Sequence, residues 1–195
     1  ELETIQRRLK SLNYFDPIYV DDGRSIQAGY RDIDIQVAEQ KTGSLTFGVG
    51  FSSVDDVVGF VGLTQRNFDI TNFKNFRGGG QRLNINLKAG SETTDASISL
   101  VEPWFMGKKL EAGVEAYYRD LLYLSDEYDL TKGGGAFHFR KAIGKKSSLK
   151  LEYRYESNDV TIEDDLIGTG SSFEQFAGDF SRSAVTVSYI LDSRN

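Results

Sequence analysis

A strict alternation of apolar and polar residues runs through most of this sequence from Gly43 onward. It begins in the segment 44–52, where every second residue is apolar: Leu45, Phe47, Val49 and Phe51, separated by Thr46, Gly48 and Gly50. The same period of two recurs in 82–89, 110–119, 149–156 and 185–189, and less regularly in 57–65, 96–102 and 128–140. Successive side chains of a β-strand point to opposite faces, so this pattern predicts about eight strands with one apolar and one polar face. Most of them approach the roughly 9 to 11 residues that cross a bilayer obliquely.

Alternation is also typical of a soluble β-sandwich, and two features favour a membrane barrel instead. The polar faces carry clustered charge, as in the segment 149–156 with Lys150, Glu152, Arg154 and Glu156. The apolar faces end in aromatic residues, as in the girdles at membrane interfaces: Tyr118, Tyr153, Tyr155 and Tyr189, with Trp104 and Phe105 beside a turn. The predicted fold class is therefore all-β, an antiparallel transmembrane β-barrel of about eight strands.

The first forty residues follow a different pattern. Leu2, Ile5, Leu9 and Leu12 have the spacing of an amphipathic helix, which the segment 13–17 ends with a proline. A short strand at 18–20, a turn at 21–23 and an alternating strand at 31–37 follow. We interpret this as the tail of an α/β module too short to fold alone, which suggests a chain cut from a longer protein. Any signal peptide has been removed or was never included, since the chain begins at a Glu with no apolar leader.

Composition excludes several classes of function. The net charge of −6 argues against nucleic acid, whose phosphates need a basic face. The sequence holds no cysteine, so disulfides and thiolate metal sites are excluded. No stretch has the roughly 18 to 20 apolar residues of a spanning helix, which excludes helical membrane proteins only.

The connections between the predicted strands form two sets of opposite charge. One set is basic and mostly short: 103–109, 142–147 and the longer 67–80. The other is acidic: 55–56, 92, 126–127 and the long segment 157–182. Outer-membrane barrels have short periplasmic turns and longer external loops, so we expect Gly43 to enter from the periplasm. Asp55, Glu92, Asp126 and Asp164 should then lie at one end of the sheet, with Lys108 and Lys145 at the other.

Residues that could carry chemistry have simpler structural explanations. His138 is the only histidine, so we expect a lumen-facing residue and no metal site. The segment 144–147 lacks the upstream glycine and the following Ser or Thr of a phosphate loop. The glycine runs 78–80 and 133–135 are expected to give close packing and curvature, and the acidic segment 157–182 to be a solvated loop without calcium-binding spacing. Four glutamates could be interpreted as acid–base pairs: Glu111, Glu115, Glu152 and Glu156. We expect them instead to be charges of the lumen, neutralised by Arg119, Lys150 and Arg154. We therefore predict no enzyme activity and no cofactor.

Six segments, in order along the chain, resemble the BamA family of outer-membrane protein assembly factors. The segment 9–15 is similar to the L-x-x-L-G-Y-F helix end of the family's POTRA modules, with Asn13 in place of Gly. The strand 33–40 resembles the last strand of the final POTRA module, and 42–51 the first barrel strand. Gly79-Gly80-Gln81-Arg82-Leu83 resembles the G-x-G-Q-x-L motif before the third strand, with spacing one residue tighter. Glu102-Pro103-Trp104-Phe105 matches the E-P-Y/W-F turn, and 188–195 resembles the family's eighth strand.

The resemblance implies more than the residues alone establish. Residues 1–41 would be the C-terminal part of a POTRA module in the periplasm, and 42–195 strands one to eight of a sixteen-stranded barrel in the bacterial outer membrane. The implied function is assembly and insertion of β-barrel proteins. The implied partners are nascent outer-membrane β-barrel proteins, accessory periplasmic lipoproteins at the POTRA region and membrane lipids.

The first predicted strand is the segment whose residues indicate a function on physical grounds. Gly43, Gly48 and Gly50 weaken this strand, because glycine gives up packing and conformational entropy. If the barrel closes through a weak seam, this edge can open and pair with a client strand. The predicted client-binding residues are Ser44, Leu45, Thr46, Phe47, Gly48, Val49, Gly50 and Phe51. Alternatively, the glycines only admit curvature.

Two other functions compete with assembly. A barrel of a two-partner-type secretion transporter would export a polypeptide through its lumen. A passive pore or adhesin of about eight strands is disfavoured by the POTRA-like start.

Overall fold

The computed structural model describes residues 2–23, 30, 32–53, 55–125, 128–144, 146–162 and 177–192. The chain divides into two compact units, Glu1–Ser44 and Leu45–Asn195.

The first unit contains a helix and a two-stranded antiparallel sheet. Helix α1 (Leu2–Ser11) precedes β1 (Phe15–Gly23), which pairs with β2 (Asp32–Glu39). The helix ends at Ser11, and Asn13 beyond it forms a left-handed cap, with a φ of 55° and its N–H donated to the Lys10 carbonyl at 3.1 Å. The predicted turn at 21–23 is wrong, because these residues continue β1 and pair with 32–34 of β2.

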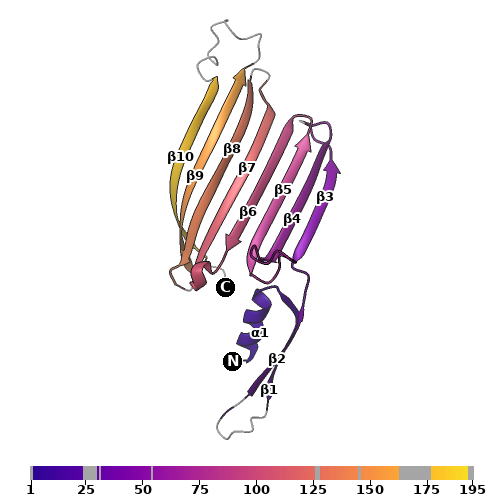
Figure 1. Ribbon diagram of the computed structural model, residues 1–195, viewed down its shortest axis with the longest axis vertical. Coiled ribbons are helices and arrows are strands. Elements are labelled where there is room, and N and C mark those ends of the chain that lie inside the picture. Colours follow the sequence, from indigo (N-terminus) through magenta and orange to yellow (C-terminus); the bar gives the residue numbers. More distant parts are fainter. Residues whose placement is uncertain are drawn as a thin grey trace. The chain divides into compact units, whose positions relative to one another are not determined.

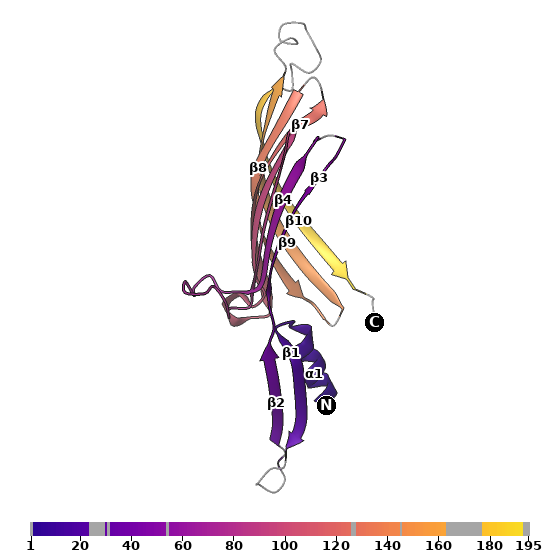
Figure 2. The ribbon, with the colours of Figure 1, turned by 90° about the vertical axis from the view of Figure 1, so that its right-hand side faces the viewer.

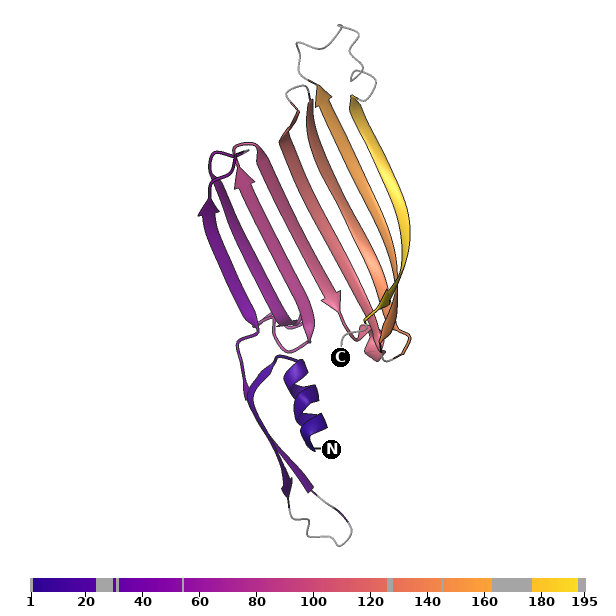
Figure 3. The same ribbon diagram turned by 180° about the vertical axis from the view of Figure 1, so that it is seen from behind.

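The second unit is one sheet of eight strands in chain order, β10-β9-β8-β7-β6-β5-β4-β3 (Figures 1 and 3). Its strands are β3 (Gly43–Gly50), β4 (Val58–Phe68), β5 (Gln81–Gly90), β6 (Thr93–Glu102), β7 (Leu110–Ser125), β8 (Tyr128–Ala142), β9 (Ser147–Ile162) and β10 (Gly178–Leu191). Consecutive strands from β4 to β10 pair antiparallel. The expected eight antiparallel strands are confirmed, and within this chain the sheet is open, with β3 and β10 at its edges.

Cross-strand register sorts the side chains into one apolar and one polar face. Partners directly opposite each other point to the same side of a sheet. One continuous row is apolar and consists of Leu100, Val114, Phe137, Tyr153 and Val185. The same side carries Ile85, Leu87, Val114, Leu151 and Val187, which we expect from the alternation to face lipid in a membrane barrel. The rows between them carry the charged residues.

The sheet is curved, as the edge-on view in Figure 2 shows. Side chains on the concave side of a curved sheet crowd one another, whereas those on the convex side spread apart. Tyr117, on the polar face, is 8% exposed, and Val114, on the apolar face, is 56% exposed. We infer that the polar face is concave and the apolar face convex, as a barrel wall with a polar lumen requires.

Several strands are longer than their apolar patterns. β7, β8 and β9 have 15 or 16 residues, and β9 and β10 extend into the segment expected to be a loop, 157–182. Asp159 and Asp179 are therefore strand residues and lie opposite each other, which corrects that expectation. Backbone pairing continues here because hydrogen bonds do not depend on side-chain polarity. Residues 163–176 of the expected loop lie outside the described residues.

The charged connections divide between the two ends of the sheet as predicted where the structure describes them. Asp55 and Glu92 lie together at one end, because the Glu92 N–H donates to Asp55 Oδ1 at 3.0 Å. Lys108 follows β6 and lies at the opposite end, since β6 runs away from the Glu92 turn. Asp126, Lys145 and Asp164 lie outside the described residues. Within the described ranges, no helix is long and apolar enough to cross a membrane.

Candidate functional site at the first strand of the sheet

β3 forms one edge of the eight-stranded sheet and has β4 as its neighbour. It is the shortest strand of the sheet, with 8 residues, while the next two strands, β4 and β5, have 11 and 10. In the sheet formed by the described residues, the backbone groups on its outer side face no further strand. An edge of this kind is a template for strand addition.

The predicted client-binding residues lie on this edge with their side chains largely free. Leu45, Phe47 and Val49 are 64%, 76% and 79% exposed, and Ser44 and Thr46 are also exposed. Gly48 and Gly50 are half-buried. Of the eight predicted residues, only Phe51 lies outside the strand, since β3 ends at Gly50. The strand stops there because the Ser52 N–H donates to the Asp55 carbonyl at 3.0 Å and turns the chain.

Contact between β3 and β4 depends on glycines in both strands. A Cβ added to Gly48 would lie 2.7 Å from ring carbons of Phe60, so the Phe60 ring occupies the space above this glycine. Gly59 faces the Val49 side chain, at 4.0 Å from its Cγ1 to an added Cβ. Glycine contributes no side chain to packing, so at these positions the contact between the two strands comes from Phe60 and Val49 alone.

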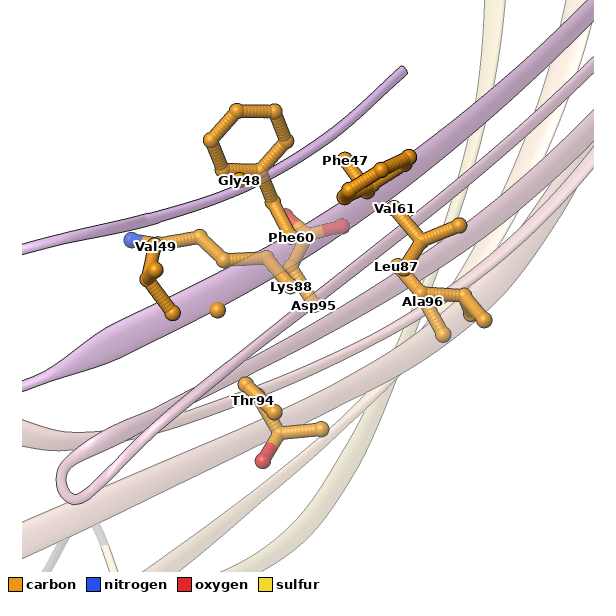
Figure 4. Close-up of a pocket in the computed structure, with 12 residues that line it drawn as sticks. Phe47, Gly48, Val49, Phe60, Val61, Leu87, Lys88, Thr94, Asp95 and Ala96 are labelled. Carbon is orange, nitrogen blue, oxygen red and sulfur yellow. The ribbon is translucent and has the colours of Figure 1, made fainter. Parts of the chain in front are cut away.

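A hollow of about 640 Å³ lies beside β3. Figure 4 shows its walls, formed by side chains of β3, β4, β5 and β6 that include Phe47, Val49, Phe60, Val61, Leu87 and Ala96. Val61, Leu87 and Ala96 belong to the apolar face, so the hollow is an open depression of that face next to β3.

The turn after β3 is fastened by Asp55, whose side chain is buried at 1% exposure. Its carboxylate accepts the Thr93 hydroxyl at 2.7 Å and the Glu92 N–H at 3.0 Å, with the Lys88 ammonium at 3.9 Å. The Thr93 hydroxyl, with smaller contributions from the Glu92 N–H and Lys88, lowers the pKa of Asp55 below its ordinary value. One end of the weak strand is therefore tied to the β5–β6 turn.

Sequence reasoning missed this role of Asp55. It placed the residue among acidic external connections, where the burial of its side chain was not expected. The only local signal is the Ser52-x-x-Asp55 spacing of a hydrogen-bonded turn, in which the Asp55 N–H donates to Ser52 Oγ at 2.7 Å. The partners in the β5–β6 turn lie 37 and 38 residues away in the chain and leave no local signal.

Ion pairs on the polar face form within β9 and reach across β8 to β7. Arg154 pairs with Glu152 at 3.1 Å and with Glu115 at 3.5 Å, and Lys150 also pairs with Glu152. The Tyr117 hydroxyl donates to Glu156 at 2.6 Å. These contacts agree with the expected neutralisation of lumen carboxylates.

Arg119 and Glu111 form ion pairs with other partners than expected. Arg119 pairs with Asp95 at 2.8 Å instead of a glutamate. Glu111 is paired with Arg82 at 2.6 Å and has Arg140 at 4.0 Å. His138 lies on the polar face with its Nε2 3.6 Å from Glu111 Oε1. Among the described residues, no group of three or more His, Cys, Asp or Glu side chains could hold a metal ion.

The glycine run 133–135 lies in β8, as expected for a packing role. A Cβ on Gly134 would lie 2.6 Å from the Tyr155 carbonyl oxygen and 2.9 Å from the Tyr117 hydroxyl oxygen. The run therefore lets the Tyr117 side chain lie flat over β8. Arg119 and Arg154 then approach the same ring, each 5.5 Å from its centre.

An antiparallel meander with an exposed apolar convex face and an ion-paired polar concave face defines the wall of an outer-membrane-type β-barrel. Residues 75–195 match the Omp85 superfamily domain, and the chain belongs to this superfamily. Together with a relative described as an outer membrane protein assembly factor, this finding confirms the resemblance to the BamA family.

The relatives agree in fold and description. A protein of Treponema pallidum (strain Nichols), described as an outer membrane protein assembly factor, is 31% identical over 167 residues, which cover 77% of this chain. The chain spans 18% of that protein's length. The crystal structure of BamA from Haemophilus ducreyi lacking POTRA domains 1–3 matches with a TM-score of 0.64 at 19% identity. That match covers 96% of this chain and 36% of the solved chain, and it shows the fold.

Proposed function

We propose that this chain is part of an outer-membrane assembly factor that inserts β-barrel proteins by pairing client strands with the edge of β3. The observation that carries the proposal is the position of β3: a short, glycine-containing strand at the edge of the sheet, beside a hollow. Membership of the Omp85 superfamily and similarity to a protein described as an assembly factor support it.

The physical driving force is backbone hydrogen bonding in a medium without water. An unpaired N–H or C=O within lipid costs several kcal/mol, so an open edge strongly favours an incoming strand. The glycines of β3 and β4 make the edge adaptable, because glycine gives up packing and conformational entropy, while Asp55 holds one end of the strand in place. Client recognition would then depend on backbone groups and tolerate many client sequences.

The same proposal assigns roles to the rest of the chain. Residues 1–41 are the end of a POTRA module in the periplasm, where accessory lipoproteins bind, and the sheet is the first half of a larger barrel. Secretion of a polypeptide through the lumen is the second candidate. The charged, ion-paired concave face favours it, because a polar lumen suits passage of a hydrated chain.

Photo-crosslinking during barrel biogenesis separates the two candidates. A crosslinker is placed at each position from 44 to 50 of β3 in the full-length protein, with Leu151 in β9 as the mid-sheet control. Adducts with nascent barrel proteins along β3, and none at Leu151, are expected for strand pairing. Adducts confined to lumen-facing positions of several strands, such as Glu115 and Glu152, would reject the assembly proposal in favour of secretion.

Proline substitution tests the reliance on backbone groups. Neighbouring residues of a strand direct their N–H groups to opposite sides, and proline has none. Of the pair Leu45→Pro and Thr46→Pro, one should block client pairing while the strand stays paired with β4, and the other should loosen β3 from β4. Leu45→Ala and Thr46→Ala are the matched controls and should leave client pairing unchanged. Equal effects of both prolines and both alanines would reject pairing through the backbone.

A further inference from the structure

The connection between β4 and β5, residues 69–80, is a folded loop with its own hydrogen bonds. The Asp69 N–H donates to the Phe76 carbonyl at 3.1 Å, and the Phe76 N–H to the Asn72 carbonyl at 2.8 Å. The Asn67 side chain accepts the Gly80 N–H at 2.9 Å, which closes the base of the loop. The rings of Phe68 and Phe76 stack with their centres 5.7 Å apart. The loop therefore holds a defined shape.

This shape presents apolar side chains to the surroundings. Phe73 is 80% exposed, and Ile70 and Phe76 are 47% and 43% exposed. The Phe73 ring has one aromatic neighbour in the loop, Phe76, at 6.1 Å between centres. Because the backbone bonds fix the loop, its apolar residues stay exposed instead of collapsing onto the sheet. Clustered exposed apolar side chains of this kind mark an interaction surface.

The position of the loop identifies the side on which a partner lies. In Figure 2 the loop projects from the convex side of the sheet, the side that carries the apolar face. The β6–β7 connection lies at the same end, joined to the base of the loop through the bond from Gln81 Nε2 to Glu102 Oε2 at 3.1 Å. That connection exposes Trp104 and Met106, at 55% and 79%. Aromatic and apolar groups thus gather at one rim of the convex face.

The charges at this rim are predominantly positive. Lys74 and Arg77 are exposed in the loop, and Lys108 and Lys109 in the neighbouring connection, where Lys109 Nζ lies 5.9 Å from the Trp104 ring centre. The acidic residue of the loop, Asp69, accepts the Thr71 hydroxyl at 2.6 Å within the loop. Aromatic rings next to lysine and arginine are typical of the boundary between acyl chains and anionic headgroups.

We propose that the loop 69–80 inserts Phe73 into the headgroup region of the leaflet on the periplasmic side, with Lys74 and Arg77 on lipid phosphates. The occupant is the phospholipid surface, because the loop projects on the convex, apolar side and carries the cations that anionic headgroups attract. The inference rests on the proposed orientation of the sheet in the outer membrane. The loop then anchors the β4–β5 hairpin in lipid. When β3 moves during client pairing, its neighbour β4 therefore stays in place.

Depth-dependent fluorescence quenching tests the insertion. The full-length protein, with other cysteines replaced, is reconstituted in vesicles of phosphatidylethanolamine and phosphatidylglycerol that contain lipids with headgroup-level nitroxides. A fluorophore is attached at Asn75→Cys, beside Phe73. Leu151→Cys on the apolar face reports the embedded sheet, and Asp34→Cys in the first unit reports the water phase. We expect quenching at positions 75 and 151, and none at 34.

Substitutions at Phe73 link the signal to the aromatic anchor. Phe73→Ser should shift the loop's insertion equilibrium on the order of tenfold toward water, as expected for exposing most of a phenyl ring, whereas Phe73→Leu should keep the label quenched. Ile143→Ser, which removes an apolar residue 55% exposed in the β8–β9 connection at the same end, is the matched control and should leave the signal unchanged. Both Phe73 variants should fold, because the side chain is largely free.

The possible failures are distinguishable. Quenching at 151 without quenching at 75 would overturn loop insertion and leave the proposed membrane orientation and client edge intact. Absence of quenching at both positions would reject the orientation together with the loop. A crosslinker at position 73 that forms adducts with a polypeptide and none with lipid would overturn the lipid surface as the occupant.

Discussion

At the scale of single residues, Asp55 connects the turn after β3 to the turn between β5 and β6. Replacing Asp55 by Ala removes the acceptor for the Glu92 N–H and the Thr93 hydroxyl. We expect amide hydrogen exchange at Glu92 to accelerate about tenfold, the loss expected for a charge-assisted hydrogen bond. Asp56→Ala, at the exposed neighbouring position, is the control and should change nothing. Equal exchange rates in the two variants would contradict the fastening role.

The same contact predicts a pH dependence. The Thr93 hydroxyl lowers the pKa of Asp55 below the ordinary aspartate value of 3.8. A carboxylate with a lowered pKa in the folded state contributes its full stabilisation above the ordinary value and loses it as the pH falls through the folded-state pKa. Exchange at Glu92, corrected for its intrinsic rate, should therefore be constant down to about pH 5 and rise only below the ordinary pKa. A rise near neutral pH would show that another group controls the turn.

The adjacent glycines 133 and 134 provide a second residue-scale test. A Cβ on Gly134 would meet the Tyr155 carbonyl oxygen and the Tyr117 hydroxyl, while nothing lies within 4 Å of one on Gly133. Gly134→Ala should lower the free energy of unfolding by about 1–3 kcal/mol, as overpacking does, and Gly133→Ala should leave it nearly unchanged. Urea titration of the protein in lipid vesicles measures both. Equal losses would mean that the glycine run acts through backbone flexibility alone.

Residue roles were the least predictable part of the chain. The sequence pattern assigned charges to the polar face correctly, because alternation fixes the side on which Glu115 and Arg154 lie. It could not identify the partner of each charge, since the pairing of Arg119 with Asp95 depends on the register between β6 and β7. The burial of Asp55 depends on contacts between distant turns, which local spacing does not encode.

At the scale of elements, the two faces of β7 predict unequal tolerance to charge. Val114 lies on the apolar face at 56% exposure, and Glu115 on the opposite face pairs with Arg154 at 3.5 Å. Val114→Arg near mid-bilayer should destabilise the protein by roughly 2–4 kcal/mol, whereas Glu115→Gln should have a much smaller effect. Unfolding in vesicles provides the comparison. Reversed effects would place the apolar face toward the lumen and reject the facing of all eight strands.

The alternation predicted where strands occur and which face each side chain lies on, but it did not predict where the strands end. Apolar alternation in 149–156 marks only the centre of β9, which extends to Ile162 because its backbone pairs with β8 and β10 beyond the apolar segment. Likewise β1 continues through Asp21-Asp22-Gly23, a run that resembles a turn in isolation, because β2 offers paired partners. Tertiary pairing overrides local turn propensity at these positions.

At the scale of the whole molecule, the alternating order of basic and acidic connections predicts which end of the sheet faces the cell exterior. Asp56 lies in the exposed turn between β3 and β4, at the end that holds Glu92, and Lys108 lies at the opposite end. The residues before Gly43, which are proposed to lie in the periplasm, lead into β3 at the end of the sheet opposite Asp56, so the Asp56 end should be external. In the full-length protein on intact cells, a membrane-impermeant thiol reagent should label Asp56→Cys and leave Lys108→Cys unlabelled until the outer membrane is permeabilised. Labelling of Lys108→Cys alone would show that the sheet has the opposite orientation, with the loop 69–80 at the external leaflet. Equal labelling of both positions in intact cells would show that the sheet does not span the membrane, and strand pairing in lipid would lose its basis.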